Sequence, residues 1–245
     1  MTVGAIVQAR MGSTRLPGKA LLDIAGMSML ARVVDRTSRA RTIDRVIVAT
    51  TTKMQDDPLA EHARMLPSVD VFRGDEDDVL DRYYQAARHY QLDVIVRITS
   101  DCPLLDPGLA DQVVQPLLDP ASHVDYSANT LRRTYPRGLD VEAVPFATLE
   151  RVRREATSVH ERAHVFPYVY EHPDRFAMAG TADTVDRSEM RWTVDTAEDL
   201  AFVREVYRAL GTRDFTWRDV LKVIDAKPEL LQINALVRQK SAHDL

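Results

Sequence analysis

Three short apolar runs, separated by stretches with helical spacing of apolar residues, dominate the first half of the chain. The runs cover residues 3–7, 46–50 and 94–98, and the helical patterns cover 27–41, 56–65 and 79–90. Continuous apolar runs of this length are typical of strands buried on both faces of a parallel sheet. A weaker run at 69–72 predicts one more strand. Strands that alternate with helices predict an α/β fold, with a mostly parallel sheet and helices on both faces.

The second half of the chain is less regular. Asp106 and Pro107 suit the cap and first turn of a helix over 106–118. Further helices are expected at 148–155, 160–172, 197–210 and 217–225, and the tail from residue 227 is expected to be partly disordered. Pro136 and Gly138 interrupt the segment 124–144, which therefore predicts extended strands and a long hairpin. We expect a single domain over 1–245 with this hairpin arm inserted.

Composition narrows the classes of partner. The 245 residues are 45% hydrophobic and 28% charged, as in an ordinary globular protein, and the net charge is -5. Since no basic stripe and no long apolar run stands out, we expect neither a nucleic-acid partner nor a membrane partner. Cys102 is the only cysteine, so no intrachain disulfide can form. With no signal-peptide pattern at the N-terminus, this favours a cytoplasmic location.

A glycine-containing basic loop follows the first predicted strand. The sequence QARMGSTRLPGK (8–19) carries Arg10, Arg15 and Lys19, and its glycines Gly12 and Gly18 allow close approach of backbone N–H groups to a ligand. Donors and fixed positive charge together suit a triphosphate. Five residues separate the glycines where the P-loop has four, and the dinucleotide fingerprint is absent. The loop therefore predicts a phosphate site of another kind.

Two carboxylates are candidate metal ligands. Asp101 follows the strand at 94–98, and a carboxylate at that strand end faces the same crevice as the loop. Asp195 lies at a second strand-to-helix junction, where taken alone it is more simply a helix cap.

The basic loop closely resembles the signature loop of the bacterial cytidylyltransferases, which include 3-deoxy-manno-octulosonate and acylneuraminate cytidylyltransferases. The likeness is strongest to the spore coat polysaccharide biosynthesis protein F group, and it continues in the segments 73–87, 97–107, 137–142, 160–176 and 191–200. The resemblance implies a single nucleotidyltransferase domain, with a fold like that of the A-type glycosyltransferases. It also implies a homodimer.

The resemblance implies an activity as well. Members transfer CMP from CTP to an acidic sugar or sugar-like acceptor and release pyrophosphate, in surface polysaccharide or related biosynthesis. Carried over, Asp101 and Asp195 bind Mg²⁺ beside the α-phosphate of the co-substrate CTP. Oxygen ligands and retained waters are what Mg²⁺ requires. Arg10, Arg15 and Lys19 would complete the catalytic set by binding the phosphates.

Further site residues follow from matching segments or from position. The expected nucleotide-binding residues are Gln8, Ala9, Gly12, Ser13, Thr50, Arg73, Asp78 and Thr99. The expected residues for a small acidic acceptor are Asp140, Glu142, His160, Arg162, Tyr168 and Arg191. Asp140 and Glu142 alternate and would share one side of a strand, although a solvated strand face explains them equally well. An ordinary ion pair explains Arg191 equally well. Thr99 and Ser100 stand where some relatives have Gln-Gly, which leaves the base and the acceptor open.

The segment HERAH (160–164) also matches the H-E-x-x-H pattern of zinc proteases. The pattern is short, and Pro167 limits the helix that it needs. We prefer a place near the acceptor pocket and expect no catalytic zinc. A glycosyltransferase that uses a nucleotide sugar and a non-catalytic nucleotide-binding protein also stay open as functions for this chain.

The homodimer is expected to form through the predicted arm at 124–144. A hairpin that projects from a compact domain exposes backbone edges and apolar side chains. The apolar side chains expected at a two-fold interface are Tyr126, Leu131, Tyr135 and Leu139.

Overall fold

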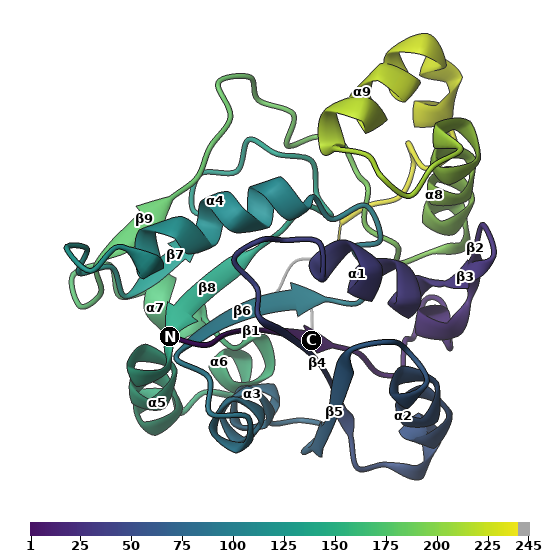
Figure 1. Cartoon of the computed structure of the whole chain (residues 1–245). Coiled ribbons are helices and arrows are strands. Elements are labelled where there is room, and N and C mark those ends of the chain that lie inside the picture. The colour runs from purple at the N-terminus through teal and green to yellow at the C-terminus, as the bar shows by residue number, and fades with distance from the viewer. Residues whose placement is uncertain (240–245) are drawn as a thin grey trace.

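A computed structural model describes residues 1–239, and its centre is a seven-stranded sheet with the order β5-β4-β1-β6-β8-β7-β9 (Figure 1). The strands are β1 Val3–Gln8, β4 Arg45–Thr51, β5 Val69–Gly74, β6 Val94–Thr99, β7 Tyr126–Ala128, β8 Glu142–Pro145 and β9 Met178–Gly180. Every neighbouring pair is parallel except those that include β8, which runs antiparallel to β6 and β7. The predicted mostly parallel α/β sheet is confirmed.

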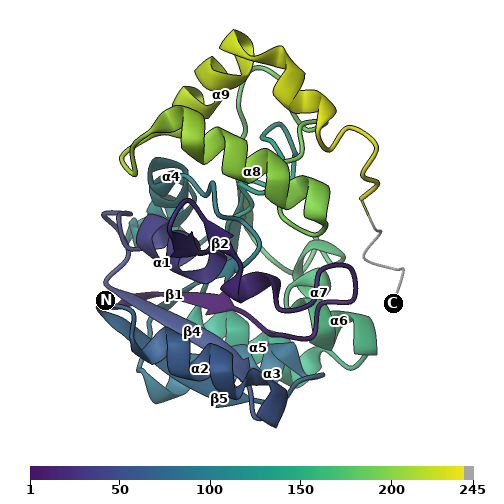
Figure 2. The same ribbon diagram turned by 90° about the vertical axis from the view of Figure 1, so that its right-hand side faces the viewer.

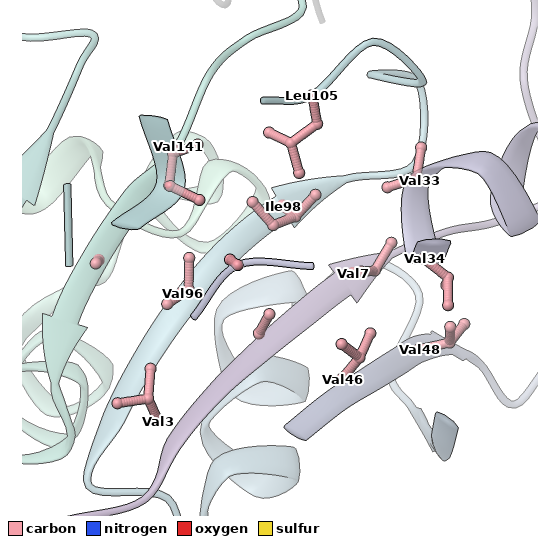
Figure 3. Close-up of a cluster of buried hydrophobic side chains, with 14 of the residues drawn as sticks. Val3, Val7, Val33, Val34, Val46, Val48, Val96, Ile98, Leu105 and Val141 are labelled. Carbon is pink, nitrogen blue, oxygen red and sulfur yellow. The ribbon is translucent and has the colours of Figure 1, made fainter. Parts of the chain in front are cut away.

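Helices cover both faces of the sheet. The helices α1 Met29–Thr37, α2 Asp57–Arg64 and α4 Pro107–Leu118 contribute to one buried apolar cluster. The helices α3 Val79–His89, α5 Phe146–Glu155 and α7 Pro167–Tyr170 contribute to a second cluster on the other face. The central strands are buried on both sides: Val7, Val48 and Val96 belong to the first cluster (Figure 3), whereas Ile6, Ile47 and Ile95 belong to the second. This double burial explains why the strands appear in the sequence as continuous apolar runs.

The helices α8 Ala197–Leu210 and α9 Trp217–Ala226 lie together beside the sheet (Figure 2), and their apolar side chains belong to a third buried cluster. This cluster surrounds the fully buried Trp192 and includes Met29 from α1 and Leu109 from α4. Three short 3₁₀ helices complete the described part of the chain, η1 Lys19–Leu21, η2 Met54–Asp56 and η3 Pro228–Gln232. No helix within residues 1–239 is both long enough and apolar enough to cross a bilayer.

Several element boundaries differ from the sequence prediction. The helix expected from residue 27 starts at Met29, because β2 Asp23–Ile24 and β3 Met27–Ser28 form a small hairpin before it. The Ser28 hydroxyl then caps the helix by accepting the N–H of Ala31 at 3.0 Å. The helix expected at 160–172 is divided into α6 Val159–His164 and α7, because Val165 has a φ of 78° and proline follows.

The C-terminal tail is more ordered than expected. The residues after α9 form η3, and Leu230 and Asn234 are buried. Asn234 donates to the carbonyl oxygen of Arg191 and to the carboxylate of Asp199, each at 3.0 Å. These contacts hold the tail against the rest of the domain. Residues 240–245, also part of the expected disordered tail, lie outside the described residues.

The segment 124–144 does not project as an arm. Its strands β7 and β8 pair with each other inside the main sheet. Tyr126 and Leu139 are fully buried and Tyr135 is 6% exposed, so the chain itself covers three of the four side chains expected at an interface; Leu131 is 38% exposed. Tyr126 packs against Phe166, and Tyr135 packs against Trp217. The homodimer stays a prediction, without these buried side chains to support it.

Candidate active site

The parallel strands bring the predicted site segments to one edge of the sheet. Gln8 ends β1 and is paired with Thr99, which ends the neighbouring β6. The basic loop therefore begins beside the turn that carries Asp101. The backbone of Val194 donates to the carbonyl oxygen of Asp101 at 2.8 Å, which fixes the segment that carries Asp195 to the same edge. Residues that are far apart in the sequence thus share one site.

Lys19 bridges the two candidate metal ligands. Its Nζ lies 3.0 Å from Asp101 Oδ2 and 2.9 Å from Asp195 Oδ1, and it donates to Val194 O at 2.8 Å. Arg15 Nη2 lies 2.9 Å from Asp195 Oδ2. The side chains of Lys19, Asp195 and Asp101 are 12%, 15% and 26% exposed, so solvent still reaches them. The structure brings together two loop cations and both aspartates.

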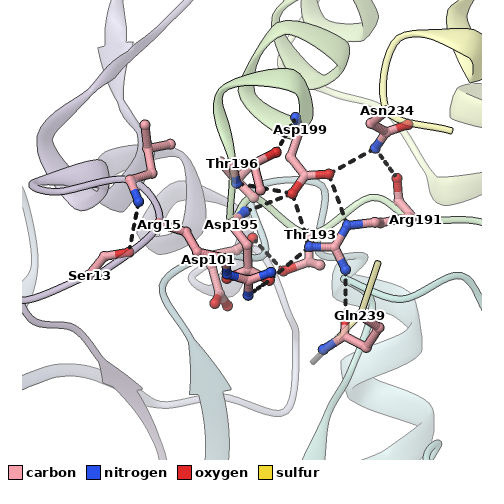
Figure 4. Close-up of polar contacts among 12 residues, drawn as sticks. Ser13, Arg15, Asp101, Arg191, Thr193, Asp195, Thr196, Asp199, Asn234 and Gln239 are labelled. Atoms are coloured by element: carbon pink, nitrogen blue, oxygen red, sulfur yellow. Dashed lines mark hydrogen bonds and ion pairs between the residues drawn. The ribbon is translucent and has the colours of Figure 1, made fainter. Parts of the chain in front are cut away.

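A buried network sets the position of Asp195 (Figure 4). Arg191 donates from Nη2 to Asp195 at 2.8 Å and from Nε to Asp199 at 2.9 Å, and it also contacts Gln239. Asp199 in turn accepts the backbone N–H groups of Asp195 and Thr196 at 3.0 and 3.1 Å. Thr196 is the N-cap of α8 and forms a capping box with Asp199. Asp195 is therefore not needed as the cap, and its carboxylate points toward the cations.

The electrostatics of this cluster favour the charged forms of Asp101 and Lys19. Burial by itself would raise the pKa of Asp101, but the Lys19 ammonium and several hydrogen bonds outweigh it and lower the pKa to about 2. Burial also opposes the charge on Lys19, yet the carboxylates of Asp101 and Asp195 raise the pKa of that ammonium above its ordinary value. At neutral pH the site thus contains an ionised carboxylate and a cation.

The loop keeps its shape through a buried carboxylate. The N–H groups of Ser13 and Gly18 both donate to the carbonyl oxygen of Met11, and Gly18 has a φ of 68° that favours glycine. The N–H of Met11 donates to Asp56 Oδ1 at 2.7 Å, and Thr51 donates to the other oxygen of Asp56. Asp56 is fully buried. It positions the loop, a role that its place before a predicted helix did not reveal.

The expected loop contacts differ in their accessibility. Arg10 and Gly12 are exposed, and Ser13 is half-buried. Ala9 is buried, so its side chain does not contact a ligand. Gln8 Oε1 accepts the hydroxyl of Tyr83 at 3.2 Å. Of these five residues, Arg10, Gly12 and Ser13 are therefore the most accessible to a phosphate.

Most of the other residues expected to bind the nucleotide are buried or form ion pairs within the protein. Thr50 is fully buried, so its side chain does not reach a ligand. Arg73 pairs with Asp57 at 2.6 Å and donates to a backbone carbonyl oxygen of β4. Asp78 caps α3 and pairs with Arg162. Thr99 is half-buried at the end of β6, next to the site.

Most of the expected acceptor residues are held in separate internal contacts. Glu142 is buried against Arg97 and accepts the hydroxyl of Tyr126 at 2.6 Å. Asp140 accepts two hydrogen bonds from Arg133, at 2.6 and 2.7 Å. Glu142 and Asp140 therefore do not form the shared carboxylate face that was expected.

The same holds for two residues on the following helices. Arg162 binds Asp78 through Nε at 2.8 Å, and the hydroxyl of Tyr168 donates to Glu155 at 3.1 Å. Of the six expected acceptor residues, only Arg191 contacts a carboxylate of the cation cluster, and its partners Asp195 and Asp199 make it part of the scaffold.

The HERAH segment forms the short helix α6, in which His160 and His164 have ring centroids 5.0 Å apart. Glu161, the residue that would be the general base of a zinc protease, instead forms a capping box with Ser158. Within residues 1–239 no third His, Cys, Asp or Glu joins the histidines in a metal-binding group. The geometry does not favour a zinc protease, and the absence of catalytic zinc stays a prediction.

The carboxylate pair fits a magnesium ion. Both aspartates already bind one cation, the ammonium of Lys19, with oxygens that suit a hard divalent ion. Across residues 1–239 no cluster of three or more His, Cys, Asp or Glu side chains forms a complete metal cage. Further ligands would have to come from water and phosphate, as is usual for Mg²⁺.

Three positioning residues were missed by sequence reasoning. They are Asp56, Asp199 and Asn234, and all are buried. The spacing of Thr196 and Asp199 is that of a capping box and could have indicated the second of them. Nothing local in the sequence indicates that Asp56 holds the loop, or that Asn234 reaches back to Arg191.

Known proteins of similar sequence cover nearly the whole chain. A family model described as Cytidylyltransferase matches residues 4–238. An uncharacterized protein of Methanocaldococcus jannaschii is 36% identical over 100% of this chain and 99% of its own length. The spore coat polysaccharide biosynthesis protein SpsF of Bacillus subtilis is 32% identical over 91% of this chain and 94% of its own length.

Solved structures give the same family and the same fold. A cytidylyltransferase from Leptospira borgpetersenii superposes with a TM-score of 0.92 at 34% identity, covering 98% of this chain and 100% of that one. A CMP:2-keto-3-deoxy-manno-octonic acid synthetase, solved in complex with CTP, has a TM-score of 0.64 at 20% identity and covers 85% of this chain and 99% of that one. The second likeness concerns the fold alone.

Proposed function

The chain belongs to the cytidylyltransferase family, and on that basis we propose that it transfers CMP from CTP to a small acidic sugar or sugar-like acceptor, with magnesium at Asp101 and Asp195. Nucleotidyl transfer from CTP is the activity of the family. The metal, the acceptor and the individual residue roles are our proposal. We also propose a place in surface polysaccharide or related biosynthesis, by analogy with the name of the Bacillus subtilis relative.

One observation carries the proposal: the loop cations and the two aspartates converge at the carboxyl edge of the parallel sheet. Arg15 and Lys19 lie within 3.0 Å of the carboxylates. A site that combines loop cations with two carboxylates can bind a triphosphate together with its metal, because the carboxylates can exchange the cation between them for a metal ion. Ligands of open parallel sheets bind at this edge.

The proposed reaction forms one bond to phosphorus and breaks another, and it releases one proton. A hydroxyl oxygen of the acceptor attacks the α-phosphorus of CTP, and the bond from that phosphorus to the bridging oxygen of pyrophosphate breaks. The acceptor hydroxyl loses its proton to solvent. Arg15, Lys19 and the exposed Arg10 bind the phosphates and neutralise the charge that leaves with pyrophosphate.

The protein supplies mainly position and charge to this reaction. Bound Mg²⁺ would neutralise phosphate charge and orient the attacking oxygen. Asp101 and Asp195 would hold the ion, and the network of Arg191 and Asp199 keeps the Asp195 backbone and carboxylate in place. Positioning of this kind accounts for much of the catalysis in phosphoryl-type transfer.

A cavity beside Asp195 offers room for the acceptor. It has a volume of about 380 Å³ and is lined by Arg15, Thr196, Glu198 and the tail residues 232–233 and 236–238. This volume lies in the range of small-molecule sites. Arg15 and Arg238 supply positive charge that suits an acidic group. We therefore place the acceptor here rather than at the internally paired Asp140 and Glu142.

The cavity can be tested through kinetics. Replacing Arg238 with alanine should raise KM for the acceptor about tenfold or more and leave KM for CTP nearly unchanged, because a charge-assisted hydrogen bond contributes about 1.5–3 kcal/mol. Arg218→Ala on α9, where Arg218 stacks on Trp217, is a matched control outside the cavity. An unchanged acceptor KM in Arg238→Ala would place the acceptor elsewhere.

The activity itself is tested by pyrophosphate release. The purified protein is incubated with Mg²⁺, one of the four ribonucleoside triphosphates and a panel of acidic sugars, and the products are identified by mass. We expect release only with CTP and an acidic acceptor, and a CMP-linked product. Transfer of a sugar from a nucleotide sugar would instead support a glycosyltransferase. Binding of CTP without turnover of any acceptor would support a non-catalytic protein.

The homodimer and the cytoplasmic location remain part of the proposal. Light scattering at micromolar concentration should give twice the chain mass of 27.7 kDa. A mass equal to that of one chain would rule out the dimer.

A further inference from the structure

Lys19 has a complete set of hydrogen-bond partners within the protein. Its ammonium is bound by one oxygen each of Asp101, Asp195 and Val194, at 2.8–3.0 Å. An ammonium has three N–H donors, so all of them are satisfied here. The side chain is only 12% exposed. Lys19 therefore behaves as a bound cation rather than as a solvated loop lysine.

This position conflicts with the proposed magnesium site. The two carboxylates that bind the ammonium are the same two that would bind the metal. A divalent ion and an ammonium cannot both bind between them, because two cations at such short separation repel strongly. Either Lys19 leaves or the metal stays out.

The position of Lys19 in the basic loop indicates what would move it. The residue follows Gly18 and begins η1, on the same loop as Arg15 and the exposed Arg10. A triphosphate that binds to this loop offers several anionic oxygens to the ammonium. Lysine has a flexible stem, so it can change partners by side-chain rotation alone.

The remaining partners of Asp195 do not depend on Lys19. Arg15 and Arg191 both bind Oδ2, whereas Lys19 binds Oδ1. When Lys19 leaves, Asp195 is still held and has one oxygen open toward Asp101. Since no full metal cage exists within residues 1–239, the other ligands of an incoming ion must come from water or nucleotide.

We propose that Lys19 is an internal counter-cation that occupies the metal position until CTP arrives, so that the carboxylate pair binds a divalent ion together with the triphosphate and not before it. This inference rests on the proposed function, because it assumes the same metal ligands. To the proposed function it adds that CTP and the metal bind together, and that Lys19 prevents earlier binding of the metal.

The test measures metal binding without turnover. Mn²⁺ is used as the probe, and free Mn²⁺ is quantified by electron paramagnetic resonance as it is titrated into nucleotide-free protein. Lys19→Met should bind one Mn²⁺ per chain about tenfold or more tightly than the wild type, because a competing charge has been removed. Lys19→Gln should behave in the same way, and thermal melting checks that each variant is folded. The matched control is Lys222→Met, since Lys222 lies on α9 and pairs with Asp219.

Two further measurements separate this inference from the proposed function. The double variant Lys19→Met/Asp101→Asn should lose the added Mn²⁺ site, which assigns that site to the carboxylates. Wild-type protein with CTP and no acceptor should remove more free Mn²⁺ than the same concentration of CTP alone. If it does not, the proposed function fails, whereas the nucleotide-free comparison still tests Lys19.

Equal Mn²⁺ affinity of the wild type, Lys19→Met and Lys19→Gln in the absence of nucleotide would overturn the inference. So would a wild-type protein that binds Mn²⁺ tightly in the absence of CTP.

Discussion

Two pairs of carboxylates in this molecule have opposite surroundings. Asp101 and Asp195 converge on one ammonium, and their side chains are 26% and 15% exposed. Asp140 and Glu142 each have an arginine of their own, Arg133 and Arg97, and Glu142 also accepts a hydrogen bond from Tyr126. The first pair shares a cation that can be exchanged. The second pair shares no cation: Glu142 is buried with Arg97, whereas Asp140, whose side chain is 37% exposed, accepts two hydrogen bonds from Arg133.

These surroundings distinguish a working carboxylate from a structural one. Both pairs look alike in the sequence, as acidic residues next to predicted strands. Asp101 and Asp195 share one lysine with a flexible stem, so they can take a new ligand when that side chain changes partners. The buried pair of Glu142 and Arg97, with its further hydrogen bond from Tyr126, resists change, because separating it leaves a buried charge without a partner.

The largest expected effect concerns the first pair. Asp101→Asn should lower kcat by about a thousandfold, since a metal site contributes several kcal/mol of transition-state stabilisation. Asp195→Asn should act in the same way. Steady-state pyrophosphate release measures both, and circular dichroism should show an intact fold. The matched control is Asp70→Asn, which removes a surface ion pair with Arg45. Near-normal turnover of either site variant would refute the assignment of these metal ligands.

The second prediction concerns the stability of the fold rather than activity. Glu142→Gln should lower the free energy of unfolding by about 3–4 kcal/mol, because it leaves the Arg97 guanidinium without its buried counter-charge. Urea denaturation measures the change. Tyr126→Phe, which removes only the hydroxyl donor, should cost about 1 kcal/mol. If Glu142→Gln were as stable as the wild type, the contrast between the two pairs would be lost.

The third prediction concerns the cations that accompany the first pair. Arg15→Ala and Lys19→Ala should each weaken CTP binding by about 1.5–3 kcal/mol, because each removes a charge-assisted contact to phosphate. Calorimetry with CTP measures the affinity. Arg39→Ala, which removes a surface ion pair with Asp35, serves as the control. Unchanged affinity in both loop variants would contradict the phosphate role of the loop.

The smallest expected effect depends on pH. The folded protein lowers the pKa of Asp101 from 3.8 to about 2. Its ionised form therefore stabilises the fold fully above about pH 4, and this contribution is lost as the pH falls toward 2. The wild type should lose up to about 2 kcal/mol more stability than Asp101→Asn between pH 5 and pH 2. Parallel loss in the two proteins would show that Asp101 is not held by Lys19 in solution.

The sequence predicts well what is local. Apolar runs and helix caps predict β1, β4, β6 and the helices between them, because a strand and its following helix are specified by neighbouring residues. The rule that parallel strands end at one edge then places the basic loop beside Asp101. The structure agrees on both points.

The sequence does not predict which distant residues pair. Lys19 and Asp195 are 176 positions apart, and only the family resemblance indicates that Asp195 belongs to the site. Arg97 and Glu142 are 45 positions apart, so nothing local indicates their burial together. Proline and glycine interrupt the segment 124–144, and that interruption is what suggests an arm. Its apolar side chains instead complete the core, since Phe166 and Trp217 from later in the chain cover them.

The central claim is that Asp101 and Asp195 hold the metal of bound CTP. The most direct measurement is a crystal structure with Mn²⁺ and a non-reacting CTP analogue, with the ion located by its anomalous scattering. The account predicts a Mn²⁺ peak bound by both aspartates and by an α-phosphate oxygen, with Lys19 moved onto the phosphates. A metal bound away from these two carboxylates, or a nucleotide bound away from this edge of the sheet, would contradict it.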